Sequence, residues 1–180
     1  MYRNGGPITD RRIRIAVVGC GRISANHFGA IAAHKDNLEL TAVCDTDAAA
    51  LKVAESKYSV PGFSALHELL EGAEVDLVAL CTPSGLHPEQ AVQVARAGKH
   101  VMTEKPMATR WADGLRMVRE CDAAGVNLFV VKQNRRNATL QLLKRAVEKR
   151  RFGRIYMVTI NVFWSRPHSH NRTADETRTR

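Results

Sequence analysis

A glycine-rich hexapeptide, Gly-Cys-Gly-Arg-Ile-Ser at residues 19–24, directly follows the apolar run Ile15–Val18. Gly19 would permit a tight turn. Gly21 would let the backbone approach a pyrophosphate at the N-terminus of a following helix, where free amides and the helix dipole favour anions. Ser24 replaces the third glycine of the G-x-G-x-x-G pattern, and alone the string is explained equally well as an ordinary strand–helix turn. The candidate contacts to a dinucleotide are Gly19, Gly21, Arg22 and Ile23.

An acidic residue, Asp45, follows the second β-branched run, Leu40–Cys44, 24 residues after Gly21. This is about where a carboxylate binds the hydroxyls of an adenosine ribose. No Arg or Lys adjoins Asp45 to receive a 2′-phosphate, which favours NAD over NADP. The alternative is a simple turn residue before Thr46 and Asp47.

A third polar turn, residues 81–88, follows the segment Val75–Cys81, which we expect to be a buried strand. Thr82 and Ser84 would contact a coenzyme there, because open α/β sheets hold ligands at the carboxyl ends of their strands. A turn with a helix N-cap explains them equally well, and His87 fits a loop or capping role better than that of a catalytic base. The candidate coenzyme contacts are Thr82, Pro83, Ser84 and His87.

A lysine follows the next strand-like run, His100–Met102, within Thr103-Glu104-Lys105-Pro106. We expect Lys105 to point into the crevice that receives a nicotinamide, together with Glu104. Its amine would hydrogen-bond to, or exchange a proton with, a substrate hydroxyl, which makes it the candidate catalytic residue. An isolated lysine is more often a solvated surface charge. Pro106 allows a cis peptide bond.

A basic stretch, Lys132–Asn137, leaves the run Asn127–Val131 at the same predicted edge. Such a cluster is suited to binding a carboxylate or a phosphate. A basic loop in which Asn137 caps the following helix is an equal alternative.

Alternating strand-like and helical segments position these turns, and this alternation predicts an α/β fold, a Rossmann-type doubly wound parallel sheet of about five strands. We expect a linking helix from Asn137 to about Arg150, then a strand over Arg154–Trp164 that begins an incomplete second α/β domain. The expected divisions are a flexible leader (1–12), the Rossmann domain (13–136), the linking helix and first strand (137–164), and a disordered polar tail (165–180).

Composition is that of a globular protein, with 44% hydrophobic and 25% charged residues in 180. No apolar run approaches the roughly 20 residues that span a bilayer, so we expect no membrane partner. Four cysteines, at positions 20, 44, 81 and 121, lack C-x-x-C spacing. They fit small buried residues in a reducing, cytoplasmic compartment better than zinc ligands or disulfides, and we predict no metal.

Basic charge is concentrated at the end of the chain, where residues 132–180 hold 13 Lys and Arg against 3 Asp and Glu. This segment would meet the phosphates of a nucleotide substrate or of a nucleic acid. The segment lacks an identifiable recognition helix and lacks a set of aromatic residues on which bases would stack. It therefore supports nonspecific nucleic-acid binding at most.

Five motifs in order, GCGRIS with a nearby NH, VCDTD, CTPSGLHPEQA, GKHVMTEKPMA and VVKQNRRN, cover about residues 13–164. They resemble the glucose–fructose oxidoreductase, inositol dehydrogenase and rhizopine catabolism family of NAD(P)-dependent dehydrogenases. Within this family, the sequence is most similar to enzymes that oxidise C3 of UDP-N-acetylglucosaminuronate in bacterial surface-polysaccharide synthesis. The resemblance implies hydride transfer to NAD, with Lys105 at the lysine of the E-K-P motif. The implied substrate contacts are Lys105, Lys132, Asn134, Trp164 and Arg166.

The same resemblance implies a second, open-faced sheet domain that covers the nicotinamide, makes oligomer contacts and supplies an acidic residue and a histidine. The sequence of residues 167–180 no longer resembles that of the family. We therefore expect a truncated or frameshifted product that binds NAD but oxidises a sugar nucleotide poorly. The alternative is a non-catalytic module that binds NAD, or a partner through the run Arg154–Trp164.

Overall fold

The computed structural model describes residues 8–163, and the chain divides into two compact units, Met1–Lys132 and Gln133–Arg180. The expected polar tail (165–180) and two predicted substrate contacts, Trp164 and Arg166, lie outside the described residues, as does most of the expected leader.

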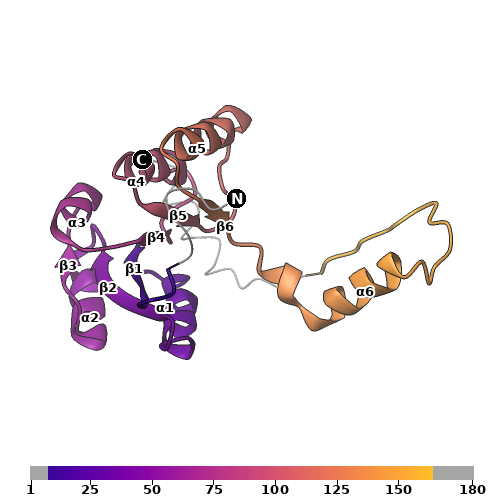
Figure 1. Ribbon diagram of the computed structural model, residues 1–180, viewed down its shortest axis with the longest axis horizontal. Coiled ribbons are helices and arrows are strands. Elements are labelled where there is room, and N and C mark those ends of the chain that lie inside the picture. The colour runs from indigo at the N-terminus through magenta and orange to yellow at the C-terminus, as the bar shows by residue number, and fades with distance from the viewer. Residues whose placement is uncertain (1–7, 164–180) are drawn as a thin grey trace. The chain divides into compact units, whose positions relative to one another are not determined.

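The first unit contains a parallel six-stranded sheet with the strand order β3-β2-β1-β4-β5-β6 (Figure 1). This order confirms the predicted Rossmann fold. The strands are β1 (Ile13–Val18), β2 (Leu38–Cys44), β3 (Gly62–Phe63), β4 (Leu77–Leu80), β5 (His100–Thr103) and β6 (Leu128–Val130). The helices are α1 (Ser24–Ala33), α2 (Ala48–Tyr58), α3 (Leu66–Gly72), α4 (His87–Arg96) and α5 (Trp111–Ala123).

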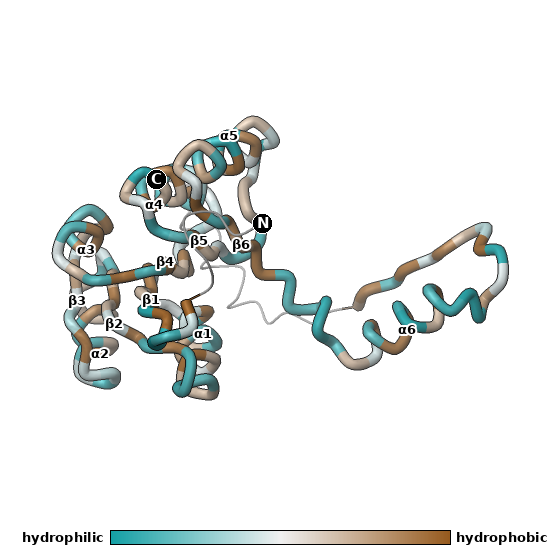
Figure 2. Tube along the Cα trace, in the orientation of Figure 1, coloured by the Kyte–Doolittle hydropathy of each residue, from teal (hydrophilic) through white to brown (hydrophobic). Residues whose placement is uncertain are grey.

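Helices cover both faces of this sheet. On one face, Val17 of β1 packs in a cluster with Phe28 and Ile31 of α1. On the other face, Val18 belongs to a cluster that includes side chains of α3, α4 and α5, among them Met117. Residues 15–18 of β1 and all of β4 are apolar because both faces of these central strands are buried there (Figure 2).

The carboxyl ends of four strands lie in register, which brings the candidate turns to one edge. Val18 at the end of β1 pairs with Cys44 of β2 and with Leu80 of β4, and Leu80 pairs with Thr103 of β5. The chain reverses its winding direction between β1 and β4, and ligands of open α/β sheets bind at such a point.

Strand β3 was not predicted from the sequence. Gly62 and Phe63 pair with Val43 and Cys44 of β2. Two residues are too few to show a strand periodicity, so only the neighbouring strand reveals the pairing.

The expectation of a flexible leader through residue 12 is wrong at its end. Arg11 donates hydrogen bonds to both carboxylate oxygens of Asp76, at 2.6 and 2.9 Å, and Arg12 lies 3.0 Å from Glu39. These ion pairs hold the segment against the sheet because Asp76 directly precedes β4.

Asp76 accepts several hydrogen bonds at the edge of the sheet where the strands begin. Besides Arg11, it accepts bonds from the backbone N–H of Arg14 at 2.8 Å and from the Arg14 guanidinium at 3.2 Å. The Arg11 guanidinium, followed by Arg14, outweighs the effect of burial and holds the pKa of Asp76 well below its usual range. The carboxylate is therefore ionised and paired at all ordinary pH values.

Replacing Asp76 with Asn should lower the free energy of unfolding by about 2 kcal/mol at neutral pH, since the lost bonds involve charged groups. In the unfolded chain the pKa of an aspartate is about 3.9. The carboxylate thus stabilises the fold above that pH, and this contribution is lost as the pH falls from about 4 toward the lower folded-state value. Urea unfolding across this range should show the two proteins converging in acid. Glu74→Gln, at an exposed partner of Arg14, should change stability much less.

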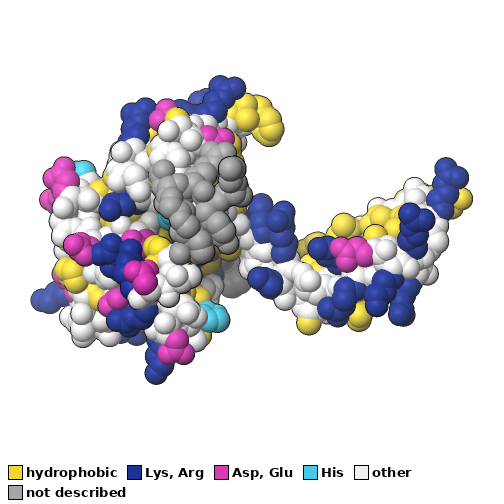
Figure 3. Space-filling model, viewed as in Figure 1, with side chains coloured by type: hydrophobic (Ala, Val, Ile, Leu, Met, Phe, Trp, Pro, Cys, Tyr) yellow, Lys and Arg dark blue, Asp and Glu magenta, His cyan; other side chains and the backbone are white. Residues whose placement is uncertain are grey.

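The second unit begins with the 3₁₀ turn η1 (Gln133–Arg136), followed by α6 (Ala138–Glu148). The side chain of Asn137 accepts hydrogen bonds from the backbone N–H groups of Thr139 and Leu140, at 3.0 and 3.4 Å, which confirms the capping role. Lys and Arg side chains are numerous over this unit (Figure 3).

The strand expected over Arg154–Trp164 is not observed in the described part of the chain. Residues 154–163 have no strand assignment and make no ladder with any described segment. A β-branched run becomes a strand only when another strand satisfies its backbone groups, and none is paired with it here.

Candidate functional site

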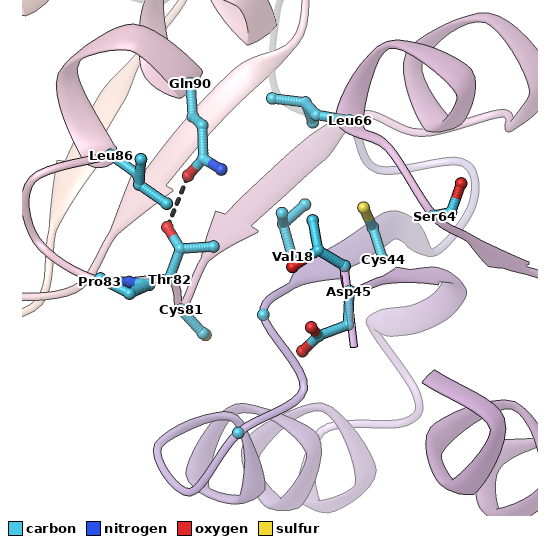
Figure 4. A pocket seen from close by; sticks show the side chains of 13 residues that line it. Val18, Cys44, Asp45, Ser64, Leu66, Cys81, Thr82, Pro83, Leu86 and Gln90 are labelled. Carbon is cyan, nitrogen blue, oxygen red and sulfur yellow. Dashed lines mark hydrogen bonds between the residues drawn. The ribbon is translucent and has the colours of Figure 1, made fainter. Parts of the chain in front are cut away.

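A cleft of about 290 Å³ lies at the carboxyl edge of β1, β2 and β4. Figure 4 shows side chains from the β1–β2 side, such as Val18 and Asp45, and from the β4–α4 side, such as Thr82 and Gln90. The lining residues are Val18, Gly19, Gly21, Cys44, Asp45, Thr46, Ser64, Leu66, Cys81, Thr82, Pro83, Leu86 and Gln90.

Gly19 brings the turn after β1 close to the backbone that follows β4 at this cleft. Its φ is +90°, and a Cβ atom there would lie 2.8 Å from the backbone carbon of Cys81 and 2.9 Å from the nitrogen of Thr82. Only glycine fits this conformation and this space. The Gly21 backbone has open space instead, with nothing within 4 Å of an added Cβ. The two glycines therefore have different roles, the first in packing and the second in leaving room beside the cleft.

The Asp45 carboxylate joins the glycine turn to the end of β2. Its Oδ2 accepts a hydrogen bond from the backbone N–H of Cys20 at 2.6 Å, and its Oδ1 accepts one from the backbone N–H of Asp47 at 2.9 Å. Asp45 is thus a turn residue, as the alternative interpretation held, and it also lines the cleft with Gly19 and Gly21. The remaining lone pairs of its oxygens are available to donors in the cleft.

Three thiols lie around this turn and remain protonated. Burial, reinforced by the charge of Asp45, raises the pKa of Cys20 to about 11. Burial raises the pKa of Cys44 and of Cys81 to about 12. These side chains therefore add no negative charge where a pyrophosphate would bind, and they do not act as nucleophiles.

The opposite wall comes from the β4–α4 turn. The Thr82 hydroxyl donates a hydrogen bond to Gln90 Oε1 at 2.5 Å, and Pro83 and Leu86 add apolar surface (Figure 4). None of the described lining residues is Lys, Arg or His.

His87 differs from the predicted coenzyme contact. Its side chain is 1% exposed and is absent from the lining of the cleft. Its Nε2 lies 2.9 Å from the carbonyl oxygen of Thr82, and its Nδ1 lies 3.0 Å from that of Pro106. The ring is therefore buried between two turns, where a coenzyme would not reach it.

The lysine turn follows β5 at the same edge. Glu104 is buried, and its carboxylate lies 2.9 Å from Nε2 of His27 on α1 and accepts a hydrogen bond from the backbone N–H of Lys105 at 3.2 Å. The Lys105 side chain is exposed, and the peptide bond to Pro106 is cis, as the sequence suggested. Glu104 thus fixes the backbone of the turn and leaves the amine of Lys105 free to meet a ligand.

The other predicted contacts lie outside this cleft. Arg22 and Ile23 precede α1, with Arg22 exposed, and Ser84 lies half-buried in the β4–α4 turn. Lys132 lines a separate cleft of about 460 Å³ with Pro106 and the start of α5. Asn134 belongs to the second unit.

Several lining residues were not predicted. Ser64 and Leu66 follow β3, so the missed strand hid them. Leu86 and Gln90 lie one helical turn apart around the start of α4, and that i, i+4 spacing is a signal that the sequence did carry.

Other parts of the described chain offer no competing metal or membrane feature. The four cysteines are free thiols, and residues 8–163 contain no group of three or more His, Cys, Asp or Glu side chains that could hold a metal ion. Among those same residues, no helix has the length and apolar character needed to cross a bilayer.

Solved structures of similar fold include two dehydrogenases with bound ligands. The WlbA dehydrogenase from Bordetella pertussis, in complex with NADH and UDP-GlcNAcA, has a TM-score of 0.90 and 62% identity over 93% of this chain and 48% of that chain. The WlbA dehydrogenase from Chromobacterium violaceum, with the same ligands, has a TM-score of 0.90 and 60% identity over the same shares.

A curated relative, the myo-inositol 2-dehydrogenase of Thermotoga maritima, is 34% identical over 149 residues, which are 82% of this chain and 44% of that protein. The chain thus spans less than half the length of these relatives. Residues 13–132 match the model of the oxidoreductase family with the NAD-binding Rossmann fold. This match confirms the predicted family, fold and coenzyme class, and the chain belongs to the glucose–fructose oxidoreductase, inositol dehydrogenase and rhizopine catabolism family of oxidoreductases.

Proposed function

We propose that the first unit binds NAD in the cleft between the glycine turn and the β4–α4 turn. The observation that carries this proposal is that Gly21, Asp45 and Thr82, which lie far apart in the sequence, line one cleft at the switch point of the sheet. The pyrophosphate would lie beside Gly21, where free amides at the start of α1 favour an anion. The adenosine would lie between Asp45 and the apolar wall of Leu66 and Leu86.

NAD rather than NADP fits the charges around the cleft. The Asp45 carboxylate would accept hydrogen bonds from the ribose hydroxyls and would repel a 2′-phosphate. Because none of the described lining side chains is basic, a 2′-phosphate would also find no cationic partner.

Replacing Asp45 with Ala should weaken NADH binding about 10-fold, because it removes hydrogen bonds to a charged acceptor. NADPH binding should change little, so the preference for NADH is lost. Fluorescence titration of both nucleotides measures these affinities. Asp47→Ala, which removes the nearby N-cap of α2 from a position outside the cleft lining, serves as the matched control for stability. Equal affinity of the wild type for the two nucleotides would contradict the proposal.

We further propose that this domain belongs to an oxidoreductase acting on a sugar-ring hydroxyl, C3 of UDP-N-acetylglucosaminuronate. Support comes from the 62% identity to a WlbA dehydrogenase complexed with NADH and UDP-GlcNAcA, and from the exposed Lys105 beside the coenzyme edge. Lys132, which lies in the first unit with the lysine turn, is a proposed substrate contact.

Bound NAD would supply the hydride acceptor that turns the C3 alcohol into a ketone. The amine form of Lys105 would accept the hydroxyl proton, so the proton leaves as the hydride leaves carbon. Glu104 and His27 would keep the lysine turn in place. Free thiols and a nucleotide-linked substrate support a cytoplasmic location for such an enzyme.

A further inference from the structure

Two turns that line or adjoin the proposed coenzyme site are connected by one buried side chain. His87 opens α4, and its ring lies between the carbonyl oxygen of Thr82 at 2.9 Å and that of Pro106 at 3.0 Å. Thr82 belongs to the wall of the cleft, and Pro106 directly follows Lys105. The two turns are thus joined across the edge of the sheet at a point between β4 and β5.

The two contacts need donors on the ring because carbonyl oxygens only accept hydrogen bonds. A neutral ring bears one N–H and donates to one of the two carbonyl oxygens, whereas a protonated ring donates to both. Burial excludes water as a substitute, since the side chain is 1% exposed. Removing the ring would therefore leave two carbonyl groups without this partner and a void between the turns.

We propose that His87 is a positioning residue that couples coenzyme binding to the placement of Lys105. This inference rests on the proposed NAD site. A ligand that restricts the motion of Thr82 and Pro83 also restricts His87, through its contact with the Thr82 carbonyl oxygen. His87 in turn restricts the motion of Pro106. Lys105, one peptide away, then presents its amine in one orientation toward the ligand.

No other described side chain has polar contacts with both turns. The Thr82 hydroxyl bonds to Gln90 within the β4–α4 segment, and Glu104 bonds to His27 and to the backbone of Lys105. The Glu104 contacts fix the start of the lysine turn to α1. His87 contacts the carbonyl oxygen of Pro106 at the end of this turn and links it to Thr82 in the wall of the cleft.

The first test uses the wild-type 180-residue chain labelled with ¹⁵N-histidine and titrated with NADH. The ring signals of His87 should shift although its side chain lies outside the cleft, while those of the exposed His34, at the end of α1, should not. If NADH binds and the His87 signals do not move, the coupling is wrong. If NADH does not bind at all, the proposed function fails instead, so the two failures are distinguishable.

The second test follows Lys105 itself, through ¹³C-dimethylation of lysines and assignment of its signal with Lys105→Arg. In the wild type, saturation with NADH should shift this signal. In His87→Ala the NADH affinity should fall about 10-fold, the size of one lost buried hydrogen bond, and the shift at saturation should largely disappear.

His87→Gln retains an N–H donor and should recover part of both effects, which a purely structural role would not predict. His34→Ala should match the wild type. A full Lys105 shift in folded His87→Gln and His87→Ala would overturn the inference. Should neither variant fold, the ring signals of the wild type decide it.

Discussion

Gly19→Ala is expected to destabilise the protein by at least about 3 kcal/mol, because it combines a strained backbone with a steric clash. The added Cβ would meet backbone atoms of Cys81 and Thr82 at 2.8–2.9 Å, and φ at this position is +90°. Strand β4 cannot move away, since the Cys81 N–H donates a 2.7 Å hydrogen bond to the Val18 carbonyl. Urea unfolding followed by circular dichroism measures the loss.

Gly21→Ala is the matched control for this change. An added Cβ would have nothing within 4 Å, and φ is not positive there, so stability should be unchanged or slightly higher. NADH affinity should nevertheless fall, because the methyl group occupies the approach of the pyrophosphate to the backbone. Equal stability of the two variants would contradict the distinct roles of the two glycines.

Lys105→Met is expected to lower the rate of NADH formation from NAD and UDP-N-acetylglucosaminuronate by about 100-fold or more, the usual contribution of a positioned general base. NADH affinity should stay within about twofold, because the Lys105 side chain is exposed and does not line the cleft. Rates are measured under single-turnover conditions, with protein in excess over sugar nucleotide, so that slow conversion is also detected.

Lys105→Arg separates charge from proton transfer. The guanidinium supplies a positive charge and hydrogen-bond donors, but it does not accept a proton at ordinary pH, so the rate should remain low. Lys52→Met, an exposed lysine on α2, should behave as the wild type. Undiminished NADH formation in Lys105→Met would remove this residue from the proposed reaction and leave the coenzyme assignment standing.

The sequence predicted most of the fold because buried parallel strands are continuous apolar runs and helix ends have local signals. The predicted strand Val75–Cys81 contains β4, and Asn137 caps α6 through bonds to Thr139 and Leu140, as the sequence suggested. The strand β3 escaped because two residues carry no period. The strand expected after Arg154 failed because β-propensity needs a paired neighbour.

Within the site, the sequence by itself determined which turns matter. Gly19 and Asp45 directly follow a strand, and Thr82 lies two residues after the end of one. Parallel strands must place such turns at one edge of the sheet. The residue types also favoured NAD, since a carboxylate without an adjacent cation selects ribose hydroxyls.

Only the tertiary structure decided what each side chain contacts. Asp45 holds the backbone of Cys20, Ser64 reaches the cleft from the far side of β2, and His87 lies buried between two carbonyl groups. These relations join residues brought together by strand order, and no local pattern records them. Hydrogen-bond partners depend on distances of about 3 Å in three dimensions, whereas sequence periodicity fixes only which face or edge a residue occupies.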